Sequence, residues 1–522
     1  MVKQYKRKIR SVIKGTLSRD NGGLINMFNI SPECEAYGKE IDRLLDEKKY
    51  GELATYIATV ETYGLTHNTP EHAIVFYYLG TGYSELANHV LKNESKDSDI
   101  SGIEYRRKAL YYFRKAISLI DLTDDSRTLY HLIYTNYANS LDACGRVIEA
   151  LRIYRKAISL SENFGMAVGN YGRALNFYAN MVNDSGHHKE LHCYAYQAIK
   201  KAISSNDPNM HMAAKRFFEE MIGTYESTTE SDILAAPIVF KQYDLGKEDE
   251  FAYRRWCLEK HLFLNPLNDV LECESAFAHD PLTITQYTEN VNKDDLSSER
   301  GVNPPRWFAM LNQLKEEYIY ARFLCYDGSE KIKDLHYADK EVKLSLSDYD
   351  YVNYSIRLEQ LKSAFRLLFS IFDKVAFFVN DFWNMGFAER QADARHIFLS
   401  DKLPKTNIAL NALYWSYSEF VKDFWPSEDA SERDLYTLRN ALEHKFVKIH
   451  EYLDDYKLEI ADDNFYHISE QTLIGQCVRL VELARECIMY LVYAIDIEES
   501  QKEKSDKAVS LKVIDFDDGW KI

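Results

Sequence analysis

Residues 134–162 read YTNYANSLDACGRVIEALRIYRKAISLSE, and this stretch decides the fold of the N-terminal half. Its small and aromatic residues recur at the spacing expected for two short helices joined by a tight turn. The first helix and its turn use Tyr134, Tyr137, Ala138, Leu141 and Gly145, and the second helix uses Ala150, Tyr154 and Ala157. Small residues let two helices approach closely, while the aromatic ring fills the groove between neighbouring pairs. The stretch therefore predicts a helix pair that stacks on similar pairs.

The same pattern returns in the neighbouring segments. Residues 109–120, ALYYFRKAISLI, match the second helix, and residues 195–208, AYQAIKKAISSNDP, match it again. A further first helix of a pair is predicted around Phe76, Leu79, Gly80 and Tyr83. Residues 36–66 are predicted to form one more helix pair. This recurrence resembles the tetratricopeptide repeat, whose unit is about 34 residues long. The resemblance implies an α-solenoid over residues 36–225 that binds a protein partner or a trigger on its concave face.

Composition supports long helices with short connections throughout the chain. Only 10 Pro and 21 Gly occur among 522 residues, and hydrophobic residues make up 46%. No apolar run approaches the length of about 18 residues that a membrane span needs, so we expect no membrane contact. The eight cysteines form no CxxC pair, which predicts reduced core thiols in a cytoplasmic protein.

Charge is distributed unevenly along the chain. The net charge is −17, which argues against a protein that coats nucleic acid but leaves room for a small basic cleft. Residues 1–20 carry seven basic side chains against Asp20 alone, so residues 1–35 are predicted to form a basic N-terminal extension. A solvated arm and a contact with an acidic partner both remain open for this segment.

The C-terminal half predicts a helical bundle. Residues 226–300 fit the repeat poorly and are expected to form a connecting or docking segment, with a linker at 297–305. Helical patterns follow at 306–325, 352–384, 406–424, 431–453 and 468–496, and the charged stretch 331–346 is compatible with a strand. The predicted fold class is all-α, with a domain at 301–522 after the solenoid.

Common catalytic and metal-binding motifs are missing from the sequence. It contains no GxxxxGK[ST], GxSxG, HExxH or GxGxxG pattern. His188 and His192 have the four-residue spacing of metal ligands on a helix, with His187 and Cys193 beside them, but no clear third ligand accompanies them. We therefore favour structural histidines there and expect neither a metal nor a cofactor.

The segment RNALEH, residues 439–444, places an arginine and a histidine on one predicted helix. At about 100° per residue, Asn440 and His444 share one face, while Arg439 lies at the edge of an apolar stripe on the other. That stripe is predicted to contain Leu435, Leu438, Leu442, Phe446 and Ile449. A histidine can move protons near neutral pH, an arginine can hold a phosphate, and RNA supplies its own 2′-hydroxyl nucleophile.

The Arg-Asn-x3-His pattern resembles the HEPN superfamily (higher eukaryotes and prokaryotes nucleotide-binding domain). The flanking segments, KSAFRLLFSIFDKVAFFVNDFW at 362–383 and LYTLRNALEHKF at 435–446, carry the same resemblance to a bacterial branch found behind tetratricopeptide repeats. The resemblance implies metal-independent endoribonucleases that act as dimers. It assigns catalysis to Arg439, Asn440 and His444.

Other residues are candidates for support only. Asp381, Asn384 and Glu443 are possible supporting groups, Asp373 is a further candidate on the earlier helix, and His450 is expected on the helix surface.

Two functions remain open at this point. The first is a cytoplasmic RNA-cleaving effector of bacterial antiviral defence, or a toxin, which forms a C2 homodimer and is regulated by the repeats. The second is a non-catalytic adaptor whose bundle only dimerises or binds a partner.

Overall fold

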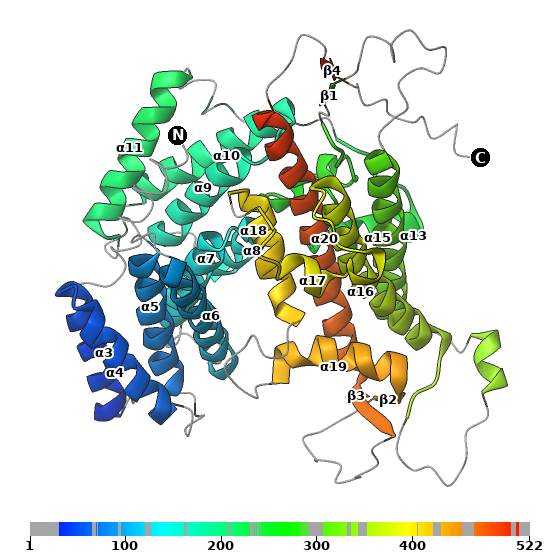
Figure 1. Ribbon diagram of the computed structural model, residues 1–522, viewed down its shortest axis with the longest axis horizontal. Coiled ribbons are helices and arrows are strands. Elements are labelled where there is room, and N and C mark those ends of the chain that lie inside the picture. The colour runs from blue at the N-terminus through cyan, green and yellow to red at the C-terminus, as the bar shows by residue number, and fades with distance from the viewer. Residues whose placement is uncertain are drawn as a thin grey trace. The chain divides into compact units, whose positions relative to one another are not determined.

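The computed structural model confirms the all-α fold class (Figure 1). It divides into two compact units, the first comprising residues 1–239, 269–271 and 424–426, and the second 240–268, 272–423 and 427–522. The structure describes residues 31–64, 69, 71–91, 96–120, 127–160, 164–205, 207, 210–229, 234, 236, 238, 240, 242–285, 288–290, 306–330, 336–342, 352–404, 406–420, 430–451, 464–502 and 508–510. Residues 1–30 of the predicted basic extension at 1–35, and the linker at 297–305, lie outside these residues, whereas a helix begins at Pro32 within the predicted extension.

Successive helices pack side by side in the first unit. Its helices are α3 (Pro32–Asp46), α4 (Tyr50–Gly64), α5 (His72–Val90), α6 (Lys96–Leu119), α7 (Arg127–Ala143), α8 (Val147–Leu160), α9 (Gly165–Ala179), α10 (Ser185–Ser204) and α11 (Met212–Thr228). Helix α5 packs on α6, α7 on α8 and α9 on α10, and α5, α7 and α9 contact one another in order. This is the stacking that the sequence pattern predicts.

The residues chosen from the sequence occupy the predicted positions. Tyr154 and Ala157 are fully buried in α8, and Gly145 adopts a φ of 84° in the turn that precedes it. At Gly80 a Cβ would lie 2.9 Å from the Phe113 ring, so α5 and α6 can approach only because this residue lacks a side chain.

The second unit is a bundle around one long helix. Its helices are α13 (Glu248–Glu259), α15 (Arg306–Glu330), α16 (Ile356–Phe382), α17 (Ala394–Phe398), α18 (Ile408–Tyr417), α19 (Ala430–His444) and α20 (Glu470–Gln501), with 3-10 turns η2 (Pro266–Asp269), η3 (Ser275–Phe277), η4 (Tyr337–Glu341), η5 (Glu389–Gln391) and η6 (Ser418–Phe420). Helix α20 contacts α15, α16 and α18, which surround it in Figure 1. None of the described helices is long and apolar enough to cross a membrane.

Strands are few and short. Strand β1 (Thr288–Asn290) pairs antiparallel with β4 (Ala508–Ser510), and β2 (Phe446–His450) pairs parallel with β3 (Phe465–Ser469). The strand considered for 331–346 is not found where the chain is described, because residues 337–341 form the turn η4. Among the cysteines, seven are buried as expected and Cys273 is exposed.

Two buried arginines bind residues 262–280 to the bundle. The Arg322 guanidinium on α15 donates to both carboxylate oxygens of Asp280, at 3.0 and 2.8 Å, and to the Leu262 carbonyl at 2.9 Å. Burial by itself would raise the pKa of Asp280, but the Arg322 guanidinium holds that pKa below its ordinary value. On α20, Arg485 donates to the carbonyls of Phe263 (2.6 Å) and Asn265 (3.0 Å). The segment expected to connect two domains is therefore, from Phe240 to Asn268, a structural part of the second unit.

This arrangement predicts where a stable C-terminal fragment begins. Residues 240–522 should unfold cooperatively in urea, whereas residues 300–522 should not, because Arg322 would lose Asp280 and Arg485 would lose the carbonyls of Phe263 and Asn265. Removing Asp280 from its buried ion pair with Arg322 costs about 3–5 kcal/mol. Each lost hydrogen bond from Arg485 to a carbonyl costs about 1.5–3 kcal/mol, so together these losses are comparable to the stability of a typical domain. Circular dichroism during urea titration distinguishes the two fragments. A cooperative transition in the shorter one would contradict the assignment.

Candidate functional site

Helix α19 carries the motif and ends at His444. Leu435, Leu438 and Leu442 are buried along one face, as the apolar stripe predicts. The expected helix over 431–453 is nevertheless wrong at its C-terminal end, because β2 begins at Phe446. Phe446 and Ile449 fit the helical spacing by coincidence, and their aromatic and β-branched side chains also suit a strand. Pairing with β3, which begins 15 residues after the end of β2, selects the strand.

Arg439 extends from α19 toward α16. Its guanidinium lies 5.6 Å from the centroid of the Phe369 ring and donates to Asn440 Oδ1 at 3.0 Å. Phe420 in turn packs edge-on against Phe369, with centroids 5.2 Å apart. A cation over an aromatic face is attracted by the ring quadrupole, so Arg439 is held in place while it remains only partly buried.

Asp373 lies within electrostatic range of Arg439. Burial raises the pKa of Asp373, an effect opposed by its hydrogen bond from the Ala394 backbone N–H (3.0 Å) and by the positive charge of Arg439. Asp373 is one helical turn from Phe369 on α16, and its hydrogen-bond donor, Ala394, is the first residue of α17. Among the acidic residues considered on α16, Asp373 is thus the one with an electrostatic interaction with Arg439.

Arg366 on α16 forms a hydrogen bond with the last turn of α19. Its guanidinium donates to the Leu442 carbonyl at 2.8 Å, and its Nε lies 3.8 Å from Glu443. A cation at a helix C-terminus satisfies an orphan carbonyl and interacts favourably with the helix dipole. Sequence reasoning missed Arg366, since nothing in its local pattern indicates a contact 76 residues away. His444, the final residue of α19, is exposed.

Asp381 and Asn384 lie away from this site. Asp381 accepts hydrogen bonds from Arg306 and from Trp307 Nε1 (2.9 Å), which join the end of α16 to the start of α15. Asn384 has a φ of 48° in the turn that follows α16. At about 1.5 Å per residue, Asp381 is roughly 18 Å along α16 from Phe369. We therefore leave both residues out of the site.

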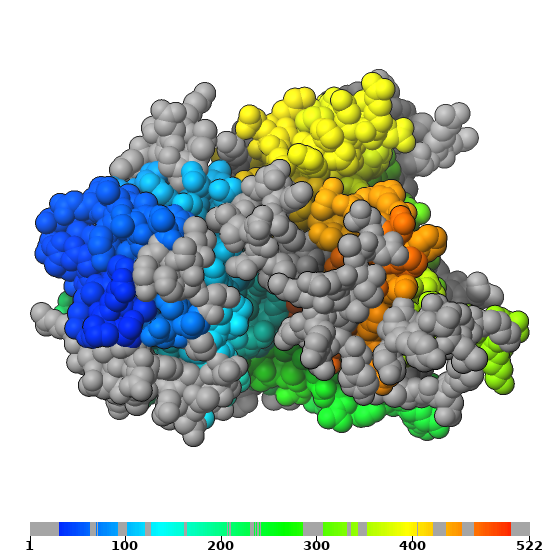
Figure 2. All heavy atoms as spheres, turned by 90° about the horizontal axis from the view of Figure 1, so that it is seen from below, coloured from blue at the N-terminus to red at the C-terminus, as the bar shows by residue number. Residues whose placement is uncertain are grey.

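The strands β2 and β3 extend the site beyond the motif helix. Parallel pairing sets Phe446 opposite Phe465 and Lys448 opposite His467. His450, expected on a helix surface, is instead a buried strand residue whose Nε2 lies 2.9 Å from His467 Nδ1. Figure 1 shows these strands next to α19, and in Figure 2 the orange atoms of α19 and the strands reach the surface.

The histidine pair of the first unit is structural. His188 Nδ1 lies 2.9 Å from the Ala179 carbonyl, and His192 Nδ1 lies 3.1 Å from the Tyr225 hydroxyl. Burial, reinforced by His188, lowers the pKa of His192 to about 4. Within the described part of the chain, no group of three or more His, Cys, Asp or Glu side chains could hold a metal ion.

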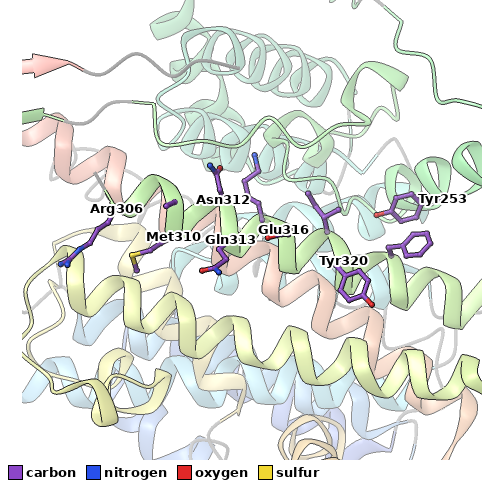
Figure 3. Close-up of a pocket in the computed structure, with 11 residues that line it drawn as sticks. Tyr253, Arg306, Met310, Asn312, Gln313, Glu316 and Tyr320 are labelled. Atoms are coloured by element: carbon purple, nitrogen blue, oxygen red, sulfur yellow. The ribbon is translucent and has the colours of Figure 1, made fainter. Parts of the chain in front are cut away.

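A separate open groove follows α15 (Figure 3). It has a volume of about 1230 Å³ and is lined by Tyr253 and by one side of α15 from Arg306 to Phe323. None of the motif residues lines it.

The contacts of α19 predict different stability effects for its two charged motif residues. Replacing Arg439 by Ala should lower the free energy of unfolding by about 1 kcal/mol, because the contact with Phe369 is lost. Replacing the exposed His444 by Ala should change it by less than about 0.5 kcal/mol. Urea unfolding of both variants, with Lys445→Ala as an exposed neighbouring control, measures the difference. A larger decrease in the free energy of unfolding for His444→Ala than for Arg439→Ala would contradict this geometry.

Comparison with known proteins finds a similarity in the C-terminal part of the chain. Residues 298–498 match the family model described as LA2681-like HEPN. No curated protein and no solved structure matches the chain. The family match leaves the repeat half unassigned, so its tetratricopeptide identity stays a prediction. It supports a C-terminal HEPN domain that contains α15 through most of α20, with the motif inside it.

Proposed function

We propose that the C-terminal domain is a metal-independent endoribonuclease. The observation that carries the proposal is the arrangement of α19: Arg439 is held by Phe369 and Asn440, while His444 is exposed at the end of the same helix. The match to HEPN domains, which are often ribonucleases, supports the same reaction class.

The chemistry requires only side chains and the substrate. His444 takes the proton of an RNA 2′-hydroxyl, the 2′-oxygen forms a bond to the adjacent phosphorus, and the bond from phosphorus to the 5′-oxygen breaks. A protonated histidine returns a proton to the leaving 5′-oxygen, so the products are a 2′,3′-cyclic phosphate and a 5′-hydroxyl. Arg439 stabilises the negative charge that develops on the phosphate oxygens, and Asn440 orients Arg439.

The spacing of the motif favours two copies of the chain at one site. Five residues on an α-helix separate two side chains by about 140°, so Arg439 and His444 of one helix diverge. A C2 dimer through this domain would bring Arg439 of one chain toward His444 of another. The first unit would then bind the protein partner or trigger that restrains cleavage, which suits a cytoplasmic antiviral-defence or toxin effector.

One observation favours a second function. The Arg439 guanidinium already has an aromatic and an amide contact, which would also serve a bundle that only dimerises or binds a partner. The adaptor function and the nuclease function differ in the outcome of the experiments below.

Cleavage should survive metal chelation. The full-length protein, incubated with total RNA in EDTA, should produce fragments that end in a 2′,3′-cyclic phosphate or its opened form. His444→Ala should reduce the rate by about 100-fold or more, because general acid–base catalysis contributes that much, while Tyr320→Ala, which changes an exposed residue of α15, should cleave normally. Activity that disappears in EDTA and returns with a divalent ion would refute the mechanism. Cleavage retained in a folded His444→Ala protein would favour the adaptor.

Mixing two inactive variants tests the dimer. Arg439→Ala and His444→Ala proteins, each inactive alone, should regain cleavage when co-refolded, since the mixed dimer contains one site with both residues intact. Light scattering should report a dimer for the wild type. No recovery in a mixture shown to contain mixed dimers would mean that both residues act within one chain.

A further inference from the structure

The two-stranded sheet after the motif has one buried face and one outward face. Side chains alternate along a strand, so Val447 and Ile449 point opposite to Phe446 and Lys448. Ile449 and its partner Ile468 are buried, which fixes the register. The other face is outward at its open end, which contains Phe446, Lys448, Phe465 and His467, and it becomes buried at His450.

Phe446 is left exposed on this face although a partner ring lies beside it. Its side chain is 72% exposed. Its ring centroid lies 5.7 Å from that of Phe465, and the Lys448 ammonium lies 4.5 Å from the Phe465 centroid. Phe465 is therefore flanked by Phe446 and a cation, whereas Phe446 presents an aromatic face to solvent.

Basic residues lie close to Phe446 along the chain. Lys445 precedes it and is exposed, Lys448 is next on the same face, and His444 lies two residues before it. The acidic neighbour Glu443 lies close to Arg366. Aromatic rings that alternate with basic side chains are the typical composition of a surface that binds single-stranded nucleic acid. An apolar protein partner would gain nothing from these lysines.

Resting on the ribonuclease function proposed above, we propose that Phe446 is a stacking platform for an unpaired nucleobase beside the phosphate that is cut, so that the enzyme selects single-stranded RNA. Two residues of extended chain span about 7 Å, so a base on Phe446 and a phosphate at His444 belong to the same or adjacent nucleotides. Lys445 and Lys448 would contact the flanking phosphates. A base inside a duplex is already stacked on both faces and cannot reach the ring.

The test measures binding apart from cleavage. The full-length His444→Ala protein, which should not cleave, is titrated with a labelled oligouridine and with a blunt RNA duplex of the same length. We expect tighter binding to the oligouridine. Adding Phe446→Ala should weaken that binding about 5- to 100-fold, the range for loss of one base–aromatic stack. Phe446→Trp should preserve it and show additional fluorescence quenching, whereas Tyr320→Ala, which removes an aromatic that is 55% exposed on α15, should have no effect.

Three results would overturn the platform. The first is an unchanged affinity for oligouridine when Phe446→Ala is added. The second is an affinity of the His444→Ala protein for the duplex that equals its affinity for oligouridine. The third is a shift in sedimentation of Phe446→Ala without a change in RNA affinity, which would identify a protein interface instead. Failure of the proposed ribonuclease function has a separate signature, namely no cleavage by the wild-type protein, or a cleavage rate that His444→Ala leaves unchanged.

Discussion

The second unit depends on the burial of α20. Every side chain from residue 487 to residue 495 is buried, over about two and a half turns, so this helix is apolar around its whole circumference. Such a helix cannot have a solvent face, and it folds only when other helices cover it on all sides. Helices α15, α16 and α18 provide this cover, and the positions of the remaining elements follow from theirs.

The packing around α20 also explains why residues from distant parts of the chain meet. Asn407 donates to the Ala494 carbonyl at 2.9 Å and the Thr285 hydroxyl donates to Asp496 at 2.9 Å, so α20 binds the start of α18 and the residues before β1. Arg322 and Arg485 extend these contacts to the Leu262–Asn265 backbone. Buried polar groups of this kind are costly unless paired, and their pairing specifies one arrangement of the surrounding segments.

The candidate site lies where this bundle reaches solvent. Helix α16 packs on α20 through its apolar face and presents Arg366 and Phe369 to α19. Two arginines thus connect the motif helix to α16. Arg439 on α19 contacts Phe369 on α16, and Arg366 on α16 contacts the Leu442 carbonyl on α19. Rigid support of this kind leaves His444 and the outward face of β2 and β3 accessible, which is what a substrate-binding surface requires.

The sequence by itself determined the all-α class, the stacked helix pairs and the helix that carries Arg439 and His444. Each rests on local spacing: small and aromatic residues at repeat positions, and leucines at 435, 438 and 442 on one helical face. Local spacing could not decide the end of α19, because residues 446–449 suit either helix or strand and only pairing with β3 selects the strand. Nor could it show that Asp373 rather than Asp381 interacts electrostatically with Arg439, since both lie on α16 about two turns apart. The assignment of residues 240–268 to the second unit likewise depends on two buried arginines whose partners are 60 and more than 200 residues away, and long-range pairing of this kind has no signature in a single sequence.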